Sequence, residues 1–379
     1  MTTVATKKRV LLYLGKFPGF GFDVDGGSIL ARQLIDTLKE RCILDVVFIR
    51  KNDELFNDPE IHNIKYVKYK DARNNKFVRR LKNLDTNREA IGNYQEYDII
   101  VAAHASKFFG FEEYPDDFWK RTVLFPMFVT SSYFRAGEDV PPKYTLLESA
   151  VISNVAHIIV PSHNDLNDLV SDYQIPASKV SVVYRGIDPV FLNTRDTFPI
   201  NMLHIVCIGS IKKQKNNLDA LRVLKSVKKA GVNADITFIC TVQDQDLYSD
   251  MIDYTNENNL TDCVHYCFQV PQAEVAAILK QMDVNISVSL WETFGRGIFE
   301  GVAAGLPTFV YSHLKCVSEI CAGNKGICFA SDAEDMALKI TAVFNDVSLY
   351  HHMVAELPEL TRKVSYLTEK EKLLTAIIG

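Results

Sequence analysis

Residues 284–307, VNISVSLWETFGRGIFEGVAAGLP, contain the pattern that decides the fold class. The apolar run at 284–288 is typical of a strand buried on both faces, and the loop after it carries Glu292 and Gly295. A helix is predicted to begin near Gly297, with Glu300 close to its first turn, and another strand follows at 307–311. A strand, a helix and a further strand in this order indicate a parallel α/β sheet.

The same alternation extends over most of the chain. In the first half, a helix is predicted at 28–39 and strands at 9–14, 45–49, 64–67, 99–103, 123–125, 157–160 and 180–183. In the second half, helices are predicted at 217–230, 273–281 and 297–304, and strands at 203–208, 235–240, 264–268, 284–288 and 307–311.

These elements predict an α/β protein with two doubly wound, Rossmann-like domains, at residues 1–195 and 196–359. The boundary is expected near 186–201, where Pro189 and Pro199 disfavour helix at the residues before them. A helical segment at about 360–379 could pack back on the first domain. Because ligands bind beyond the carboxyl ends of parallel strands, two facing sheets predict a deep cleft between the domains.

The composition is that of a globular protein, with 47% hydrophobic and 23% charged residues among 379. A net charge of −5 argues against a dedicated nucleic-acid binder. We expect a cytoplasmic protein, because the first apolar run is too short for a signal peptide and no run approaches the roughly 18 residues of a membrane span. The eight cysteines form no CxxC pair, and most lie in strand-like runs that suggest reduced, buried thiols.

Glu292 and Glu300 belong to a loop and helix start that suit a phosphorylated sugar ligand. A helix N-terminus offers unpaired N–H groups to a diphosphate, and Gly295 and Gly297 let the backbone approach it closely. Carboxylates repel phosphate but accept hydrogen bonds from vicinal hydroxyls. By themselves, two glutamates eight residues apart are weak evidence and are better explained as solvated surface carboxylates.

The segment 284–307 closely resembles the donor motif of the family 4 glycosyltransferases, which have the GT-B fold. Gly26-Gly27, before the first predicted helix, is similar to the glycine pair that opens the family's acceptor domain. Residues 182–188, VVYRGID, and 208–216, IGSIKKQKN, are similar to the segment that ends that domain and to the phosphate-binding loop of the donor domain. The resemblance covers about residues 9–326, and it assigns acceptor binding to the first domain and donor binding to the second.

The resemblance implies a role for each matching residue of the second domain. Glu300 would bind the ribose hydroxyls, Glu292 the donor sugar, and Lys215 the diphosphate as it leaves. Backbone amides would hold the sugar and phosphate, and they belong to Phe294, Gly295, Arg296, Gly297 and Ile298. An exposed lysine in a lysine-rich loop is the alternative for Lys215.

Two residues of the first domain match as well. The amide of Gly27 would reach the phosphate, so that domain closure would complete the site. His104 would contact the donor sugar near the reacting carbon. A plain loop-to-helix turn and a structural histidine are the respective alternatives.

One position departs from the family. Ser210 stands where the family usually has an arginine that binds the diphosphate together with Lys215. We hypothesise that Arg296, at a typically apolar position, supplies the missing charge, with Lys212 and Lys213 as alternative sources.

The resemblance implies transfer of a hexose or N-acetylhexosamine from a UDP- or GDP-linked sugar to a hydroxyl of a glycan, lipid-linked sugar, protein or small molecule. Family members retain the anomeric configuration and need no side-chain nucleophile. The alternatives are a nucleotide-sugar epimerase or hydrolase, and a non-catalytic partner subunit. No cofactor is expected, and metal independence is expected although Asp23-Val24-Asp25 and Asp244-Gln245-Asp246 spell the metal-binding DxD pattern.

The sequence leaves the donor base, the acceptor and the oligomeric state open. Aromatic residues that could stack on an acceptor are Phe17, Phe20, Phe22, Phe128, Tyr133 and Phe134, although core packing is as good an explanation. The segment 76–82, KFVRRLK, from Lys76 to Lys82, could dock weakly on the inner membrane face, or form a solvated helix face.

Overall fold

The computed structural model describes residues 7–14, 26–50, 57–68, 80–126, 129–135, 137, 139–195 and 197–379. They divide into two compact units. Of the described residues, the first unit holds those up to Tyr184 together with 370–379, and the second holds those from Arg185 to Glu369.

The first unit is built on a seven-stranded parallel sheet in the order β3-β2-β1-β4-β5-β6-β7. Its strands are β1 (Arg9–Tyr13), β2 (Ile43–Arg50), β3 (Asn63–Lys68), β4 (Ile99–Ala102), β5 (Thr122–Leu124), β6 (His157–Val160) and β7 (Val180–Val182). Its helices include α1 (Gly26–Lys39), α3 (Leu84–Ile91), α4 (Asp116–Trp119), α5 (Thr130–Arg135), α6 (Pro142–Asn154) and α7 (His163–Tyr173). Each of the seven predicted strands is confirmed, with ends shifted by one or two residues.

The last helix, α15 (Tyr366–Ile378), begins in the second unit and ends in the first. Leu373 and Ile377 are buried in the cluster that packs one face of the first sheet, together with residues of β1 and α1. The far carboxyl end of the chain is therefore part of the first unit's core.

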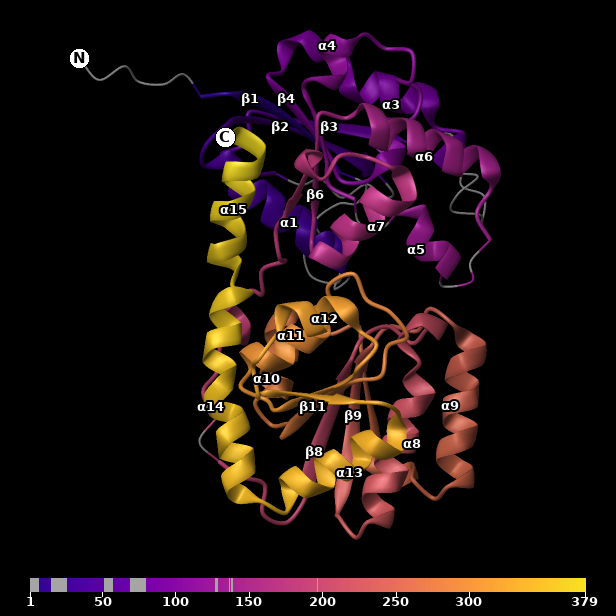
Figure 1. Ribbon diagram of the computed structural model, residues 1–379, viewed down its shortest axis with the longest axis vertical. Coiled ribbons are helices and arrows are strands. Elements are labelled where there is room, and N and C mark those ends of the chain that lie inside the picture. Colours follow the sequence, from indigo (N-terminus) through magenta and orange to yellow (C-terminus); the bar gives the residue numbers. More distant parts are fainter. Residues whose placement is uncertain are drawn as a thin grey trace, which may run out of the picture. The chain divides into compact units, whose positions relative to one another are not determined.

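The second unit contains a six-stranded parallel sheet in the order β10-β9-β8-β11-β12-β13. Its strands are β8 (Leu203–Ile208), β9 (Ala234–Cys240), β10 (Val264–Phe268), β11 (Val284–Ser287), β12 (Thr308–Tyr311) and β13 (Ile327–Ala330). Its helices include α8 (Asn217–Lys229), α9 (Gln245–Glu257), α10 (Gln272–Leu279), α11 (Arg296–Ala303), α12 (Lys315–Ile320), α13 (Ala333–Phe344) and α14 (Val347–Lys363). Within this unit α8 packs against α9 and α13, while α11 packs against α14 and β11 (Figure 1).

Strand β13 is the one strand of the structure that the sequence pattern did not predict. It is four residues long, lies at the edge of the sheet and has two half-buried residues in its middle. Its sequence, ICFA, is apolar throughout, but an apolar run of only four residues cannot be told from a buried helix segment by its pattern alone.

The segment 185–195 lies with the second unit rather than ending the first. Ile187 pairs with Ser365, and the amide of Asn193 donates to the Ala303 carbonyl at the end of α11. Arg195 forms a buried ion pair with Asp283, just before β11. These contacts tie the segment to the helix and strand of the donor motif.

Each sheet reverses its strand order at one place, between β1 and β4 in the first unit and between β8 and β11 in the second. At such a switch point, the loops after the two neighbouring strands run to opposite faces of the sheet. This opens a crevice at the carboxyl edge, where ligands bind. The segments after β1, β4, β8 and β11 hold most of the predicted site residues.

Candidate active site

The position of α11 is set by residues that allow very close packing. Gly295 caps its start with φ of 84°, a left-handed conformation that favours glycine. A Cβ on Gly297 would lie 2.8 Å from the carbonyl oxygen of Ile208, so this glycine lets the first turn of α11 lie against the end of β8. A Cβ on Gly301 would meet the side-chain amide of Asn285.

Asn285, in β11, fastens the helix to the sheet. Its amide nitrogen donates to the carbonyl oxygens of Gly297 and Ile298, at 3.3 and 3.2 Å. The side chains of Phe294 and Ile298 are buried, and Phe294 stacks on Phe299 at 4.7 Å. The side chains of these two positions thus serve the core, and the amide of Ile298, which was predicted to bind the ligand, donates instead to the Gly295 carbonyl at 2.9 Å.

Lys215 and Glu292 meet at the carboxyl edge of the sheet. The Nζ atom of Lys215 donates to Oε1 of Glu292 at 2.5 Å, and the hydroxyl of Ser289 donates to the same oxygen at 2.7 Å. Two further hydrogen bonds to backbone carbonyls join the two loops. The side-chain amide of Gln214 donates to the Trp291 carbonyl, and the backbone amide of Leu290 donates to the Gln214 carbonyl, both at 2.8 Å. Residues 77 positions apart in the sequence thus form one charged pair.

Glu300 is paired with Arg296, one turn earlier on α11. The Nε atom of Arg296 lies 2.8 Å from Oε1 of Glu300. Burial raises the pKa of the Glu300 carboxyl, and the nearby Arg296 and Lys215 oppose this effect. The Nη1 atom of Arg296 donates to the carbonyl oxygen of Gly186 at 3.2 Å.

Ser210 is bonded to two residues of the loop that follows β9. Its hydroxyl lies 2.9 Å from the hydroxyl of Thr241 and accepts from the side-chain amide of Gln243 at 3.1 Å. The position that is usually arginine in the family is therefore part of a small neutral hydrogen-bond network.

In the first unit, Gly27 lies in the first turn of α1, and His104 follows β4. His104 has φ of 141° and ψ of 139°, a conformation that is strained for any residue except glycine. Its Nδ1 atom accepts from the backbone amide of Ser106 at 3.1 Å and lies 2.8 Å from the Ser106 hydroxyl. Since Nδ1 accepts a backbone N–H, we assign the ring proton to Nε2, which lies 3.4 Å from the hydroxyl of Tyr144.

The surroundings of His104 keep it neutral. Burial lowers its pKa well below the ordinary value, and the positive charges of Arg80 and Lys107 act in the same direction. Arg80 is the first described residue of the basic segment 76–82, so this end of the segment lies near a buried cluster, while 76–79 lie outside the described residues.

Several residues of these clusters had no signal in the sequence. Ser289 and Ser106 are small polar residues without a motif of their own, and Tyr144 and Glu148 lie on α6, far along the chain from His104. Glu148 is fully buried and accepts from the Thr130 amide and the Tyr173 hydroxyl, both at 2.7 Å. Burial raises the pKa of Glu148, whose side chain joins α6 to the start of α5 and the end of α7.

Of the two DxD patterns, Asp23 to Asp25 lies outside the described residues. Asp244 caps α9, because its carboxylate accepts from the amide of Leu247 at 3.0 Å. Across the described part of the chain, no group of three or more His, Cys, Asp or Glu side chains could hold a metal ion. No helix among the described residues is long and apolar enough to cross a membrane.

Among the aromatic residues considered for the acceptor, Phe17, Phe20, Phe22 and Phe128 lie outside the described residues. Tyr133 packs against the core of the first unit, whereas Phe134 is 54% exposed. All eight cysteines are free thiols, and most of them are buried, as the sequence pattern predicts.

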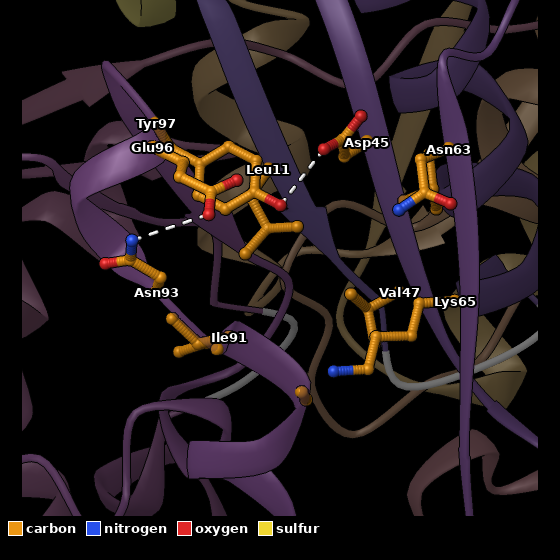
Figure 2. A pocket seen from close by; sticks show the side chains of 12 residues that line it. Leu11, Asp45, Val47, Asn63, Lys65, Ile91, Asn93, Glu96 and Tyr97 are labelled. Atoms are coloured by element: carbon orange, nitrogen blue, oxygen red, sulfur yellow. Dashed lines mark hydrogen bonds between the residues drawn. The ribbon is translucent and has the colours of Figure 1, made fainter.

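A polar pocket in the first unit lies away from these residues (Figure 2). It is lined by side chains that include Asp45, Lys65, Glu96 and Tyr97. Asp45 accepts from the Tyr97 hydroxyl and from Arg9, both at 3.0 Å. Since Asp45 is near the start of β2 and Tyr97 precedes β4, the pocket is at the amino edge of the sheet, and no predicted site residue lines it.

Two family models of glycosyltransferases match this chain, one in each half. The family described as Glycosyl transferases group 1 matches residues 197–358, and Glycosyltransferase Family 4 matches residues 24–191. A glycogen synthase of Mycobacterium tuberculosis is 23% identical over 188 residues. The match covers 48% of this chain, and the chain spans somewhat less than half, 44%, of that relative.

Solved structures with the same fold cover nearly the whole chain. The sucrose-phosphate synthase of Thermosynechococcus elongatus has a TM-score of 0.82 at 13% identity, over 97% of this chain and 98% of that one. Anabaena HepE, in complex with UDP and glucose, has a TM-score of 0.77 at 12% identity, over 98% and 99% of the two chains. WaaG, a glycosyltransferase involved in lipopolysaccharide biosynthesis, has a TM-score of 0.76 at 13% identity, over 98% and 100%.

The two family matches together span both parallel-sheet units, and the residues of the donor motif occupy the carboxyl edge of the second sheet. The chain belongs to the family 4 glycosyltransferases and has the GT-B fold.

Proposed function

We propose that this glycosyltransferase moves a hexose or N-acetylhexosamine from a UDP- or GDP-linked sugar to a hydroxyl acceptor, with retention of anomeric configuration. The observation that carries the proposal is the pairing of Lys215 with Glu292 beside the start of α11, where Glu300 is also held. A cation, free helix-start amides and two carboxylates at one sheet edge match the phosphates and hydroxyls of such a donor.

In this proposal Lys215 stabilises the negative charge that grows on the diphosphate as its bond to the anomeric carbon breaks. The acceptor oxygen bonds to the same face of that carbon, and its proton passes to the departing phosphate oxygen. Glu292 binds hydroxyls of the donor sugar, and Glu300 binds those of the ribose. His104 donates through Nε2 to the donor sugar, and Gly27 offers its amide to the phosphate.

The proposal needs no metal ion or cofactor, because Lys215 and the amides at the start of α11 supply the positive charge. Lys212 or Lys213, in the same loop, would compensate for the arginine that is absent at Ser210. Activity lost in EDTA and restored by a divalent ion would contradict metal independence.

The first experiment is a thermal shift with UDP, GDP and their sugars. A ligand at 100 times its dissociation constant should stabilise the protein by about 2.7 kcal/mol, and the series identifies base and sugar together. The donor that binds is then incubated with and without candidate acceptors, and the anomeric configuration of the product is determined by NMR. An inverted product would contradict the retaining mechanism.

The same assay separates the alternatives. Sugar released or isomerised from the donor alone would identify a hydrolase or an epimerase. Binding of the donor without turnover on any acceptor would favour a non-catalytic partner subunit.

We also place the protein in the cytoplasm, because eight free cysteines suit a reducing compartment. A lipid-linked acceptor would bring it to the inner membrane face. Co-sedimentation with anionic vesicles at low salt tests this contact, and its absence would remove the membrane option.

A further inference from the structure

Arg296 makes two contacts in opposite directions from the start of α11. Its Nε atom lies 2.8 Å from Oε1 of Glu300, and its Nη1 atom donates to the Gly186 carbonyl at 3.2 Å. Its third nitrogen, Nη2, is buried and has no hydrogen-bond partner among the described residues. Nε is buried as well and makes no hydrogen bond of normal geometry, so it meets Glu300 as an ion pair, while the side chain as a whole keeps 18% of its surface exposed.

Glu369 is a second carboxylate beside Gly186 and near Arg296. It is 1% exposed, and neither carboxylate oxygen makes a hydrogen bond of normal geometry to a described residue. A Cβ on Gly186 would lie 2.7 Å from its Oε2 atom, so the carboxylate rests directly against the Gly186 backbone. Burial raises the pKa of Glu369, while Arg185, the Gly186 backbone and Arg296 oppose the rise.

The arrangement is poorly suited to a diphosphate contact by Arg296. Arginine binds phosphate through a free, forked pair of N–H donors. In Arg296 the Nε and Nη2 atoms are both buried, and Nη1 is bonded to a backbone carbonyl. A forked contact with a phosphate would therefore require the side chain to leave Glu300 and Gly186.

We propose that Arg296 is a positioning residue for nucleoside recognition: it holds the carboxylate of Glu300 in the charged form and orientation that accept the ribose hydroxyls, and is itself held by Gly186 and Glu369. This inference rests on the proposed function, because it takes Glu300 as the ribose ligand. It differs from the charge compensation considered for Ser210, since the ligand group affected is the ribose and not the diphosphate.

The test compares two affinity ratios in Arg296→Met and in wild type by calorimetry. Ribose discrimination is the ratio of dissociation constants for the 2′-deoxy and the ordinary nucleoside diphosphate. Phosphate discrimination is the ratio for the nucleoside monophosphate and diphosphate. The uridine or the guanosine series is used, whichever wild type binds more tightly.

In Arg296→Met we expect affinity for the ordinary nucleoside diphosphate to fall about tenfold. The reason is that the ribose hydroxyl loses its hydrogen bond to a well-placed, charged Glu300 carboxylate. Affinity for the 2′-deoxy compound should change little, so ribose discrimination collapses while phosphate discrimination persists. Arg362→Met, which alters an exposed arginine near the end of α14, is the matched control and should keep both ratios.

Collapse of phosphate discrimination with ribose discrimination intact would overturn the inference in favour of a diphosphate contact. Two unchanged ratios would overturn it in favour of a purely structural pair. Failure of wild type to bind any nucleotide would instead overturn the proposed function itself.

Glu369→Gln provides a second arm that does not depend on the folding of Arg296→Met. It keeps the shape of the side chain and removes the charge that faces Arg296. We expect ribose discrimination to fall in the same direction, with phosphate discrimination unchanged. Wild-type ribose discrimination in this variant would contradict a role for Glu369 in holding Arg296.

Discussion

Single residues of the candidate site are held by partners that a ligand would have to join or displace. Lys215 is bonded to Glu292, and Glu292 also accepts from Ser289. A donor diphosphate that approached Lys215 would share the positive charge of this lysine with the Glu292 carboxylate. The pair therefore balances the charges of a part-buried cation and a part-buried anion.

Replacing Lys215 with alanine should lower kcat/KM by roughly 10²- to 10³-fold, because stabilisation of the leaving diphosphate is lost. Steady-state kinetics with the identified donor measure the effect. Lys229→Ala, at the exposed far end of α8, is the control and should keep wild-type kinetics. Equal kinetics for the two variants would show that Lys215 does not contact the leaving group.

His104 has an unfavourable backbone conformation that glycine would adopt without strain. His104→Gly and His104→Ala both remove the imidazole, but only glycine relieves the positive φ. We expect the glycine variant to be more stable than the alanine variant by about 1 kcal/mol, after allowance for the greater freedom of glycine in the unfolded chain.

Both variants should lose at least about tenfold in kcat/KM if the imidazole donates to the sugar. Thermal unfolding and kinetics on the same samples separate the two effects. An alanine variant as stable as the glycine variant would contradict strain at this position.

At the scale of elements, α11 is placed by small residues rather than by its apolar face alone. Gly297 meets the end of β8, and Gly301 meets Asn285 of β11. Interiors are packed tightly enough that one added methyl group must displace a neighbour. The distance between α11 and the sheet therefore also sets where Glu300 and Arg296 lie.

Gly301→Ala should destabilise the protein by about 1–3 kcal/mol, since the three nearest atoms to the added Cβ all belong to the Asn285 side chain. Asn285→Ala removes two of those atoms, Nδ2 and Cγ, together with the hydrogen bonds to α11, and keeps only the Cβ. The double variant should be more stable than the sum of the single effects predicts, as denaturant unfolding of all four proteins would reveal. Strict additivity of the two single effects would mean that the added Cβ does not clash with the side-chain amide of Asn285.

At the scale of the molecule, each unit has a core of its own. The buried cluster built on β8, β9 and β11 takes its residues from the second unit, and this unit also holds Lys215, Glu292, Arg296 and Glu300. Gly27 and His104 belong to the first unit. In the proposed function, donor binding and completion of the catalytic site therefore fall to different units.

A fragment of residues 185–369 should unfold cooperatively on its own and bind the nucleoside diphosphate, because its core is intact. It should not transfer sugar, because it lacks His104 and Gly27. Circular dichroism on heating and calorimetry with the nucleotide measure the two properties. A fragment without a cooperative transition would show that its core depends on the first unit.

The sequence by itself determined the two parallel sheets and the approximate limits of twelve of the strands, because buried parallel strands are continuous apolar runs separated by helical periodicity. It also identified the loop and helix start at Gly295 to Glu300, since glycine and helix-start patterns are local. The edge strand β13 escaped prediction because its burial depends on neighbours that are distant in the chain.

Only the tertiary structure decided what the site residues contact. Nothing local pairs Lys215 with Glu292 across 77 residues, or joins Arg296 to the Gly186 carbonyl across 110. From the sequence, Arg296 was a candidate to bind the diphosphate because of its charge. In the structure its guanidinium forms an ion pair with Glu300. Side-chain partners of this kind follow from how β8, β11 and the crossing segments pack, and packing is set by the whole fold rather than by any one stretch of sequence.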